Sequence, residues 1–525
     1  MSAESSQPTV RQGTFDDSAA ADALVLVGPA PFRGVDLPGP VRDAAAALLA
    51  ADPSLGRGQV GVVACPTAPG GRLVLAPTGD LAHWTDDVRR YGEAALLGAR
   101  RALASGATRP ALAVAAAAPH DAGRFERAGL VAATAALAAG WQHPQVRLGS
   151  EASPLDEILA VAGVDAAAVE RANALETGRA LARDLTAGDP ECAAPEPFAA
   201  RCERAFIGGP VQIEVQRDAQ AVCAHNPLLG AVARASMAVA RHQPRVVVLR
   251  YDGGPGPHFF FAGKGVTYDT GGADLKVGGA MAGMSADKGG AAAVAGLFAV
   301  LGALRPRGVR ATAWLGCVRN SIGADAFVSD EILVSRAGVR VVVGNTDAEG
   351  RMVLADMLAA LRPEAEAAGD DVICMSVATL TGHVIRAYGP YPSVMGNGVA
   401  VERGWPQRIA QAGAQLGEPF EVSTIRREDY EMIAPKWAGG PVVQCNSAAS
   451  VNTPRGHQFP FAFLERTSGF EEPGDVGAAP LPYVHLDVAG CVTHRGGALS
   501  GLPTGVPVAA LAGAVLGWEP SPSSR

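Results

Sequence analysis

Residues 259–272 read FFFAGKGVTYDTGG and give the strongest indication of the fold class. Three consecutive phenylalanines leading into a glycine-rich turn are typical of a strand buried on both faces, as in the sheets of α/β proteins. Asp269 lies at the end of this strand, and Lys276 and Asp287 follow along the chain. The sequence therefore predicts an α/β sheet with charged side chains at a strand end, where open α/β folds bind ligands.

A second charged run, NTDAEGR at residues 345–351, follows another apolar segment, VVV at 341–343. Its charged residues Asp347, Glu349 and Arg351 are spaced two residues apart. In an extended segment this spacing projects all three side chains to one side. We therefore expect two carboxylates and a guanidinium to face one site.

Together the two runs place four carboxylates in glycine-rich turns, and such a cluster repels itself unless positive charge lies at its centre. Divalent metals suit this arrangement because they prefer oxygen ligands and carboxylates can bridge two ions. The alternative is a set of solvated loop charges, which is the better interpretation for any single Asp. It fits the group poorly, because the flanking segments are apolar.

The two runs closely resemble the signatures of the leucyl (cytosol) aminopeptidase family of two-metal exopeptidases. The family pattern G-K-G-x-x-x-D-[ST]-G-G-x-x-x-K occurs at residues 263–276, and N-T-D-A-E-G-R occurs unchanged at 345–351. The resemblance covers roughly the C-terminal two thirds of the chain and is weak or absent before about residue 180.

The resemblance implies a role for each charged residue. It assigns a tighter metal to Lys264, Asp269, Asp287 and Glu349, and a more exchangeable one to Asp269, Asp347 and Glu349. It also implies that Lys276 stabilises the oxyanion and that Arg351 holds a bicarbonate-like anion as general base. A neutral lysine ligand is reasonable at Lys264, because two adjacent dications and desolvation both lower the pKa of an amine. Zinc or manganese is expected, with magnesium or cobalt also tolerated.

The resemblance further implies an uncharged, mostly apolar pocket for the side chain of the first substrate residue, favouring Leu or Met. Its candidate lining residues are Met284, Thr379, Leu380, Gly382 and Ala489. A Met on an apolar surface more often belongs to the core, so packing is the competing interpretation. His383 and His485 are expected to pack or cap rather than to react.

Alternation of apolar and helical segments predicts two α/β domains, the first with a mostly parallel sheet and the second doubly wound and catalytic. The expected organisation is a flexible tail at 1–20, an N-terminal domain at 21–163, a linker helix and hinge at 164–189, and a catalytic domain at 190–525. A Pro-rich stretch at 190–197 is expected to act within the hinge.

The chain has 525 residues and a net charge of −8, which disfavours nucleic acid and anionic membranes as partners. The start of the chain lacks the order of a signal peptide, and the Ala-rich runs are too short to span a bilayer. We therefore expect a cytoplasmic protein. The resemblance implies peptide substrates with a free N-terminus and a homohexamer.

The sequence contains neither the zinc-protease motif H-E-x-x-H nor the serine-nucleophile motif G-x-S-x-G, so it gives no support to these other hydrolase mechanisms. Three residues beside the expected site depart from the family pattern: Ser285, Lys288 and Arg319. They keep open the alternative of a catalytically weak or silent relative with a structural or binding role.

Overall fold

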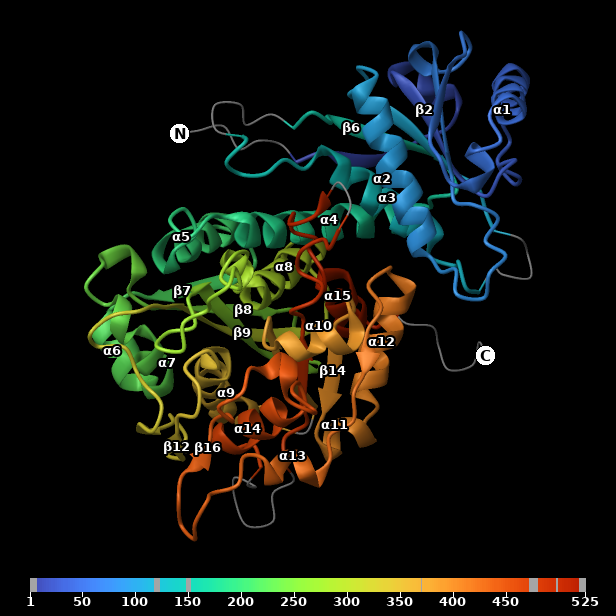
Figure 1. Cartoon of the computed structure of the whole chain (residues 1–525). Helices are drawn as coiled ribbons and strands as arrows, with labels where there is room; N and C mark the ends of the chain where they lie inside the picture. The colour runs from blue at the N-terminus through green and yellow to red at the C-terminus, as the bar shows by residue number, and fades with distance from the viewer. Residues whose placement is uncertain are drawn as a thin grey trace. The chain divides into compact units, whose positions relative to one another are not determined.

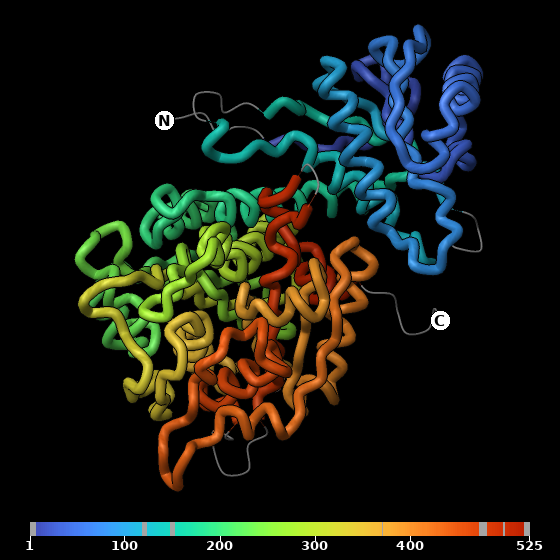
Figure 2. Tube along the Cα trace, viewed as in Figure 1, coloured from blue at the N-terminus to red at the C-terminus, as the bar shows by residue number. Residues whose placement is uncertain are grey.

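The computed structural model describes residues 7–117, 123–147, 153–369, 371–471, 480–496 and 499–518. The chain forms two compact units, Met1–Ala180 with Gly413–Glu418, and Leu181–Ala412 with Pro419–Arg525. Most of the first unit is blue to teal in Figure 2, and the second runs from green to red. The division falls within the expected linker helix, α4 (Ala166–Ala187). The stretch expected to act as a hinge is partly helical, because α5 (Pro195–Phe206) begins inside it.

The first unit contains a six-stranded sheet in the order β1-β6-β5-β2-β4-β3, and every neighbouring pair except β3–β4 is parallel. Its strands are β1 (Thr9–Gln12), β2 (Ala23–Gly28), β3 (Gly61–Ala64), β4 (Arg72–Pro77), β5 (Pro110–Val114) and β6 (Glu157–Ala162). Its helices are α1 (Gly39–Ala51), α2 (Arg89–Ala104), α3 (Ala128–Leu137) and the first part of α4. The mostly parallel sheet is as predicted.

The expectation of a flexible tail at residues 1–20 is wrong from Thr9 onward, and residues 1–6 lie outside the described part of the chain. Residues 9–12 form β1, which pairs in parallel with β6. The side chain of Asn173 accepts a hydrogen bond from Val10 N at 2.7 Å and donates one to the Val10 carbonyl at 2.9 Å. The segment is ordered because an edge of the sheet and a distant helix satisfy its backbone, and neither partner is visible in the local sequence.

The second unit contains an eight-stranded sheet in the order β15-β14-β17-β13-β9-β10-β8-β7. Its strands are β7 (Gln212–Gln216), β8 (Arg245–Asp252), β9 (His258–Asp269), β10 (Arg310–Asn320), β13 (Val372–Ala378), β14 (Ser393–Gly396), β15 (Glu421–Val422) and β17 (Tyr483–Asp487). The four central strands β17, β13, β9 and β10 are parallel to one another. Their carboxyl ends therefore meet at one edge of the sheet.

The remaining helices of this unit are α6 (Ala219–His225), α7 (Pro227–Ala233), α8 (Gly289–Leu304), α9 (Glu349–Ala367), α10 (Gly382–Tyr388), α11 (Gly398–Glu402), α12 (Trp405–Gln415), α13 (Arg427–Glu431), α14 (Phe459–Thr467) and α15 (Val508–Leu516). A separate three-stranded sheet holds β11 (Ile332–Val334), β12 (Arg340–Val342) and β16 (Val442–Val443). The predicted strand before the second charged run is β12, and it belongs to this small sheet.

The three phenylalanines of β9 explain the central layer. Figure 1 shows α8 and α9 on opposite sides of β8 and β9. Phe261 meets Phe298 of α8 edge to face at 6.3 Å between ring centroids. Phe260 belongs to the core cluster that also contains the apolar side of α9. Successive side chains point to opposite faces of a strand, so only an apolar run can be buried under helices on both sides.

Candidate active site

The expected carboxylates come together where the central strands end and two helices begin. Asp269 is the last residue of β9, and Asp287 lies two residues before α8. Glu349 is the first residue of α9, with Asp347 in the turn before it. Helix N-termini present unpaired N–H groups and partial positive charge, which favours carboxylates at these positions.

Two lysines lie among these carboxylates. Lys264, in the middle of β9, is buried, and its Nζ lies 2.7 Å from Asp287 Oδ1 and 2.9 Å from Glu349 Oε1. Its Nζ also donates to the carbonyl of Thr379 at 2.8 Å. Lys276 Nζ lies 3.0 Å from Asp269 Oδ2, and it forms an ion pair with Asp347. Each lysine therefore forms ion pairs with two of the four carboxylates.

Two glycines of the motifs are required by close packing. A Cβ on Gly350 would lie 2.5 Å from Lys264 Cε, so any larger residue would displace that lysine. Gly272 has φ +66°, and a Cβ there would lie 3.0 Å from both Asn320 Oδ1 and Thr346 Oγ1. The glycines therefore bring the backbone of each loop close to the charged cluster.

The donor set fits divalent cations. Carboxylate oxygens of Asp269, Asp347 and Glu349 lie within 4.8 Å of one another. Asp287 Oδ2 and Glu349 Oε2 are buried and make no hydrogen bond with any residue that the structure describes. Buried carboxylate oxygens without a partner are costly, and a hard cation is the ligand that they prefer.

Burial and mutual repulsion raise the pKa values of three acids of the cluster, Asp287, Asp347 and Glu349. Burial, followed by the charges of Asp269 and Glu349, raises the pKa of Asp347 to about 7. Burial also raises the pKa of Glu349, and it raises that of Asp287 well above the ordinary value. Desolvation lowers the pKa of Lys264, but the surrounding carboxylates outweigh it and the net pKa is raised. Further positive charge among these carboxylates would therefore stabilise their ionised forms.

Arg351 does not lie as predicted. The expectation that Asp347, Glu349 and Arg351 share one side of an extended segment is wrong, because α9 begins at Glu349. A helix turns about 100° per residue, so Glu349 and Arg351 diverge. Arg351 is buried, donates from Nη1 to the carbonyl of Gln444 at 3.0 Å, and lies 4.8 Å from the ring centroid of Phe459. Its Nε is a buried donor without a hydrogen-bond partner among the described residues.

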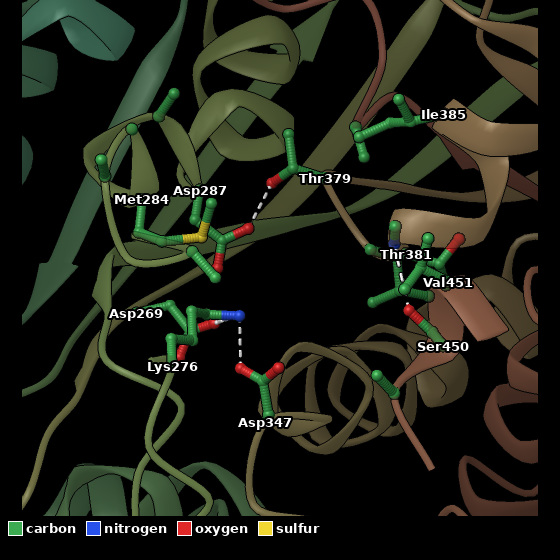
Figure 3. Close-up of a pocket in the computed structure, with 18 of the residues that line it drawn as sticks. Asp269, Lys276, Met284, Asp287, Asp347, Thr379, Thr381, Ile385, Ser450 and Val451 are labelled. Carbon is green, nitrogen blue, oxygen red and sulfur yellow. Dashed lines mark hydrogen bonds and ion pairs between the residues drawn. The ribbon is translucent and has the colours of Figure 1, made fainter. Parts of the chain in front are cut away.

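A cavity of about 1000 Å³ opens over the cluster. Every residue expected in the side-chain pocket lines it: Met284, Thr379, Leu380, Gly382 and Ala489. The five expected metal ligands and Lys276 line it too, whereas Arg351 is not part of this lining. Figure 3 shows Met284 and Thr379 near Asp287, with Ile385 and Val451 on the other side of the cavity.

The loop after β13, which carries the pocket residues Thr379 and Leu380, is held by a buried acid that the sequence motifs do not include. Asp487, the last residue of β17, accepts hydrogen bonds from Leu380 N at 3.1 Å and Thr381 Oγ1 at 2.6 Å. It also accepts from Ala489 N at 3.3 Å, so one carboxylate orders both segments of the pocket wall. Burial raises the pKa of Asp487 to about 6. Its position two residues before the expected pocket residue Ala489 is the signal that the sequence offers.

Asp274, which the sequence motifs also leave without a role, joins the two motif loops. Its carboxylate accepts from Thr346 N at 2.7 Å and from Thr346 Oγ1 at 3.1 Å, and its own N–H donates to Thr346 Oγ1 at 2.8 Å. Asn320, at the end of β10, donates from Nδ2 to Asp269 Oδ1 and to the carbonyl of Thr346. These bonds fix the loop carrying Lys276 against the loop carrying Asp347.

Two of the three departures from the family pattern, Lys288 and Arg319, make their hydrogen bonds and ring contacts with groups other than the carboxylates. Lys288 is fully buried, and its Nζ donates to the carbonyls of Gly188, at 2.8 Å, and Ser285. Arg319 lies 5.3 Å from the ring centroid of Tyr268, and its Nη1 is 3.2 Å from His242 Nε2. Within the described part of the chain, neither cation forms an ion pair with an expected metal ligand.

The two histidines pack, as predicted. His485 is buried with Nδ1 2.7 Å from Ser376 Oγ, and burial lowers its pKa to about 3. His383 Nδ1 lies 2.7 Å from His457 Nδ1. Neither residue is among the described residues that line the cavity.

Comparison with known proteins gives a consistent result. The cytosol aminopeptidase family, catalytic domain, matches residues 180–512. A Caenorhabditis elegans protein provisionally named as an aminopeptidase is 37% identical over 429 residues, which is 81% of either chain. A protein of Leifsonia xyli subsp. xyli, provisionally named as a cytosol aminopeptidase, is 34% identical over 483 residues, or 90% of either chain.

Two solved structures share the fold. A mutant of tomato leucine aminopeptidase superposes with a TM-score of 0.76 at 21% identity and covers 98% of both chains. The bottromycin maturation enzyme BotP in complex with Mn gives 0.74 at 23% identity, covering 95% of this chain and 100% of that one. At this identity the likeness shows the α/β fold.

Proposed function

The chain belongs to the cytosol aminopeptidase family, and from that premise we propose that it is a metal-dependent aminopeptidase acting on peptides with a free N-terminus. Its activity is then hydrolysis of the first peptide bond, with leucine-like first residues preferred. The observation that carries the proposal is the buried carboxylate cluster, in which Asp287 Oδ2 and Glu349 Oε2 have no hydrogen-bond partner in the described part of the chain.

The donor set supports two divalent cations per chain, zinc or manganese first and magnesium or cobalt as alternatives. Lys264, Asp269, Asp287 and Glu349 would hold one, and Asp269, Asp347 and Glu349 the other. When bound, such a pair supplies an acidified water as nucleophile and an electrophile for the scissile carbonyl. The named BotP structure contains Mn, which makes manganese the first metal to test.

The chain's own cations complete the proposed chemistry. Lys276 has its Nζ beside Asp269 and Asp347 at the cavity, and this contact supports the proposal that it donates to an oxyanion. We propose further that a bicarbonate-like anion lies against Arg351. The buried and unpartnered Nε of Arg351 supports this anion, because a desolvated guanidinium donor favours a charged acceptor.

Met284, Leu380 and Ala489 give the proposed side-chain pocket an apolar lining. An apolar first residue gains free energy of roughly 25 cal/mol per Å² of surface removed from water in such a pocket. A free amine would be required, because the lone pair of an acylated nitrogen is delocalised into its carbonyl and is not available to a metal.

The decisive experiment is hydrolysis of Leu-p-nitroanilide by metal-stripped protein to which Mn²⁺ or Zn²⁺ is returned. We expect metal-dependent release of p-nitroaniline, loss of activity in Asp347→Ala, and no reaction with N-acetyl-Leu-p-nitroanilide. A folded protein that turns over no substrate with any of the four metals would refute the proposal.

That negative result would instead support the alternative, a catalytically silent relative with a structural or binding role. Lys288 and Arg319 are the reason for this alternative. Their side chains, however, contact a backbone carbonyl and an aromatic ring rather than the carboxylates. We therefore favour the active enzyme. We also propose homohexameric assembly in the cytoplasm, and light scattering would test it by giving six times the chain mass of 53.4 kDa. None of the described helices combines the length and apolar character of a bilayer span.

A further inference from the structure

An exposed arginine lies on the wall of the active-site cavity, next to the proposed side-chain pocket. Arg495 lines the cavity together with Ala489 and Val492, and its Nε donates to the carbonyl of Gly490 at 3.2 Å. The guanidinium is thus attached to the same short segment that forms one wall of the pocket.

The backbone that carries Arg495 is firmly placed. Thr493 bridges to Pro503, and Thr504 N donates to the carbonyl of Val492 at 3.0 Å. One step further, His494 N donates to the carbonyl of Leu502 at 2.8 Å. The backbone next to Arg495 is therefore held at the cavity by hydrogen bonds between these paired segments, in addition to the contact that its own side chain makes.

The guanidinium of Arg495 has no carboxylate partner within the described part of the chain. Among the described residues, three lysines and arginines line the cavity, and two of them, Lys264 and Lys276, are paired with carboxylates. Arg495 forms no ion pair with any residue that the structure describes, and its one hydrogen bond there goes through Nε to a backbone carbonyl. Its terminal amino groups therefore remain available for an anionic group of a ligand.

We infer that Arg495 binds a carboxylate of the substrate and extends the specificity of the enzyme to peptides that begin with glutamate. The inference rests on the proposed function. The side chain of the first residue is the favoured source of the carboxylate, because Arg495 is joined to the segment bearing Ala489 and Val492. Glutamate can lay its methylene groups against the apolar wall and reach a cation beyond it. A carboxylate on the second residue is the competing source.

The test compares kcat/KM for Glu-p-nitroanilide with that for Gln-p-nitroanilide, which has the same shape without the charge. We expect the Glu/Gln ratio to fall roughly twofold to fivefold in Arg495→Gln, the range of an exposed ion pair, and to be retained in Arg495→Lys. The wild-type ratio should also decline as salt rises from about 0.05 to about 0.5 M, because exposed charges are screened.

Arg307→Gln is the matched control, since Arg307 is an exposed arginine in the loop between α8 and β10 that does not line the cavity. Its Glu/Gln ratio should equal that of the wild type. A parallel pair, Leu-Glu-NH₂ and Leu-Gln-NH₂, reports on the second residue. The inference is overturned if Arg495→Gln lowers only the Leu-Glu-NH₂/Leu-Gln-NH₂ ratio, or if it lowers neither ratio. Absence of hydrolysis with every substrate would instead refute the aminopeptidase proposal itself.

Discussion

Replacing Lys288 by Met tests whether a buried lysine beside the carboxylate cluster costs stability at neutral pH. Lys288 is fully buried, and desolvation, only partly offset by Asp189 and Asp287, lowers its pKa from 10.5 to about 7. The unfolded chain therefore binds this proton between pH 7 and pH 10.5 while the folded protein does not. The free energy of unfolding must then rise with pH across that window.

The size of the effect follows from the pKa. Lowering a pKa from 10.5 to about 7 corresponds to about 5 kcal/mol in total, of which about 2 kcal/mol falls between pH 7 and pH 9. The second unit has roughly 340 residues and an unfolding entropy of about 0.7 kcal/mol/K, so this difference corresponds to about 3 °C in Tm.

The assay is calorimetry of metal-stripped wild type and Lys288→Met at intervals between pH 7 and pH 9. The wild type should gain about 3 °C in Tm relative to the variant over this range. Lys436→Met, at an exposed lysine, should follow the wild type. Identical pH dependence of the wild type and Lys288→Met would refute the reasoning. Retained aminopeptidase activity in Lys288→Met would show, in addition, that this departure from the family pattern is not needed for catalysis.

Three further outcomes are expected. Asp347→Ala should lower the Mn²⁺ stoichiometry measured by titration calorimetry from two ions to one, and unchanged stoichiometry would contradict its assignment as a ligand. Asp487→Ala should reduce kcat/KM for Leu-p-nitroanilide roughly tenfold or more, with a smaller loss in Asp487→Asn, because Leu380 N and Thr381 Oγ1 lose their buried acceptor. Asp274→Ala should lower kcat more than it raises KM by loosening the two motif loops, whereas Asp274→Asn keeps one acceptor oxygen and should recover part of the rate. Equal rates in the two Asp274 variants would argue against that role for the carboxylate.

Residue types and their spacing were sufficient to predict the α/β class, the family and the members of the charged cluster. Three consecutive phenylalanines fit a strand covered on both faces, and the motif glycines permit the close approach that Lys264 and Thr346 make. Short-range chemistry of this kind is encoded locally, so the residue types and their spacing were enough to name the expected ligands and pocket residues.

The contacts between segments that are distant along the chain could not be predicted from local sequence and are seen only in the folded protein. The order of residues 9–12 depends on Asn173 and on β6, and the direction of Arg351 depends on where α9 begins. The bond from Lys288 to Gly188 and the position of Arg495 beside Gly490 likewise depend on folding. Each is a contact made by backbone groups or lone charges, which carry no periodic pattern along the chain and are fixed only when the sheet and its loops assemble.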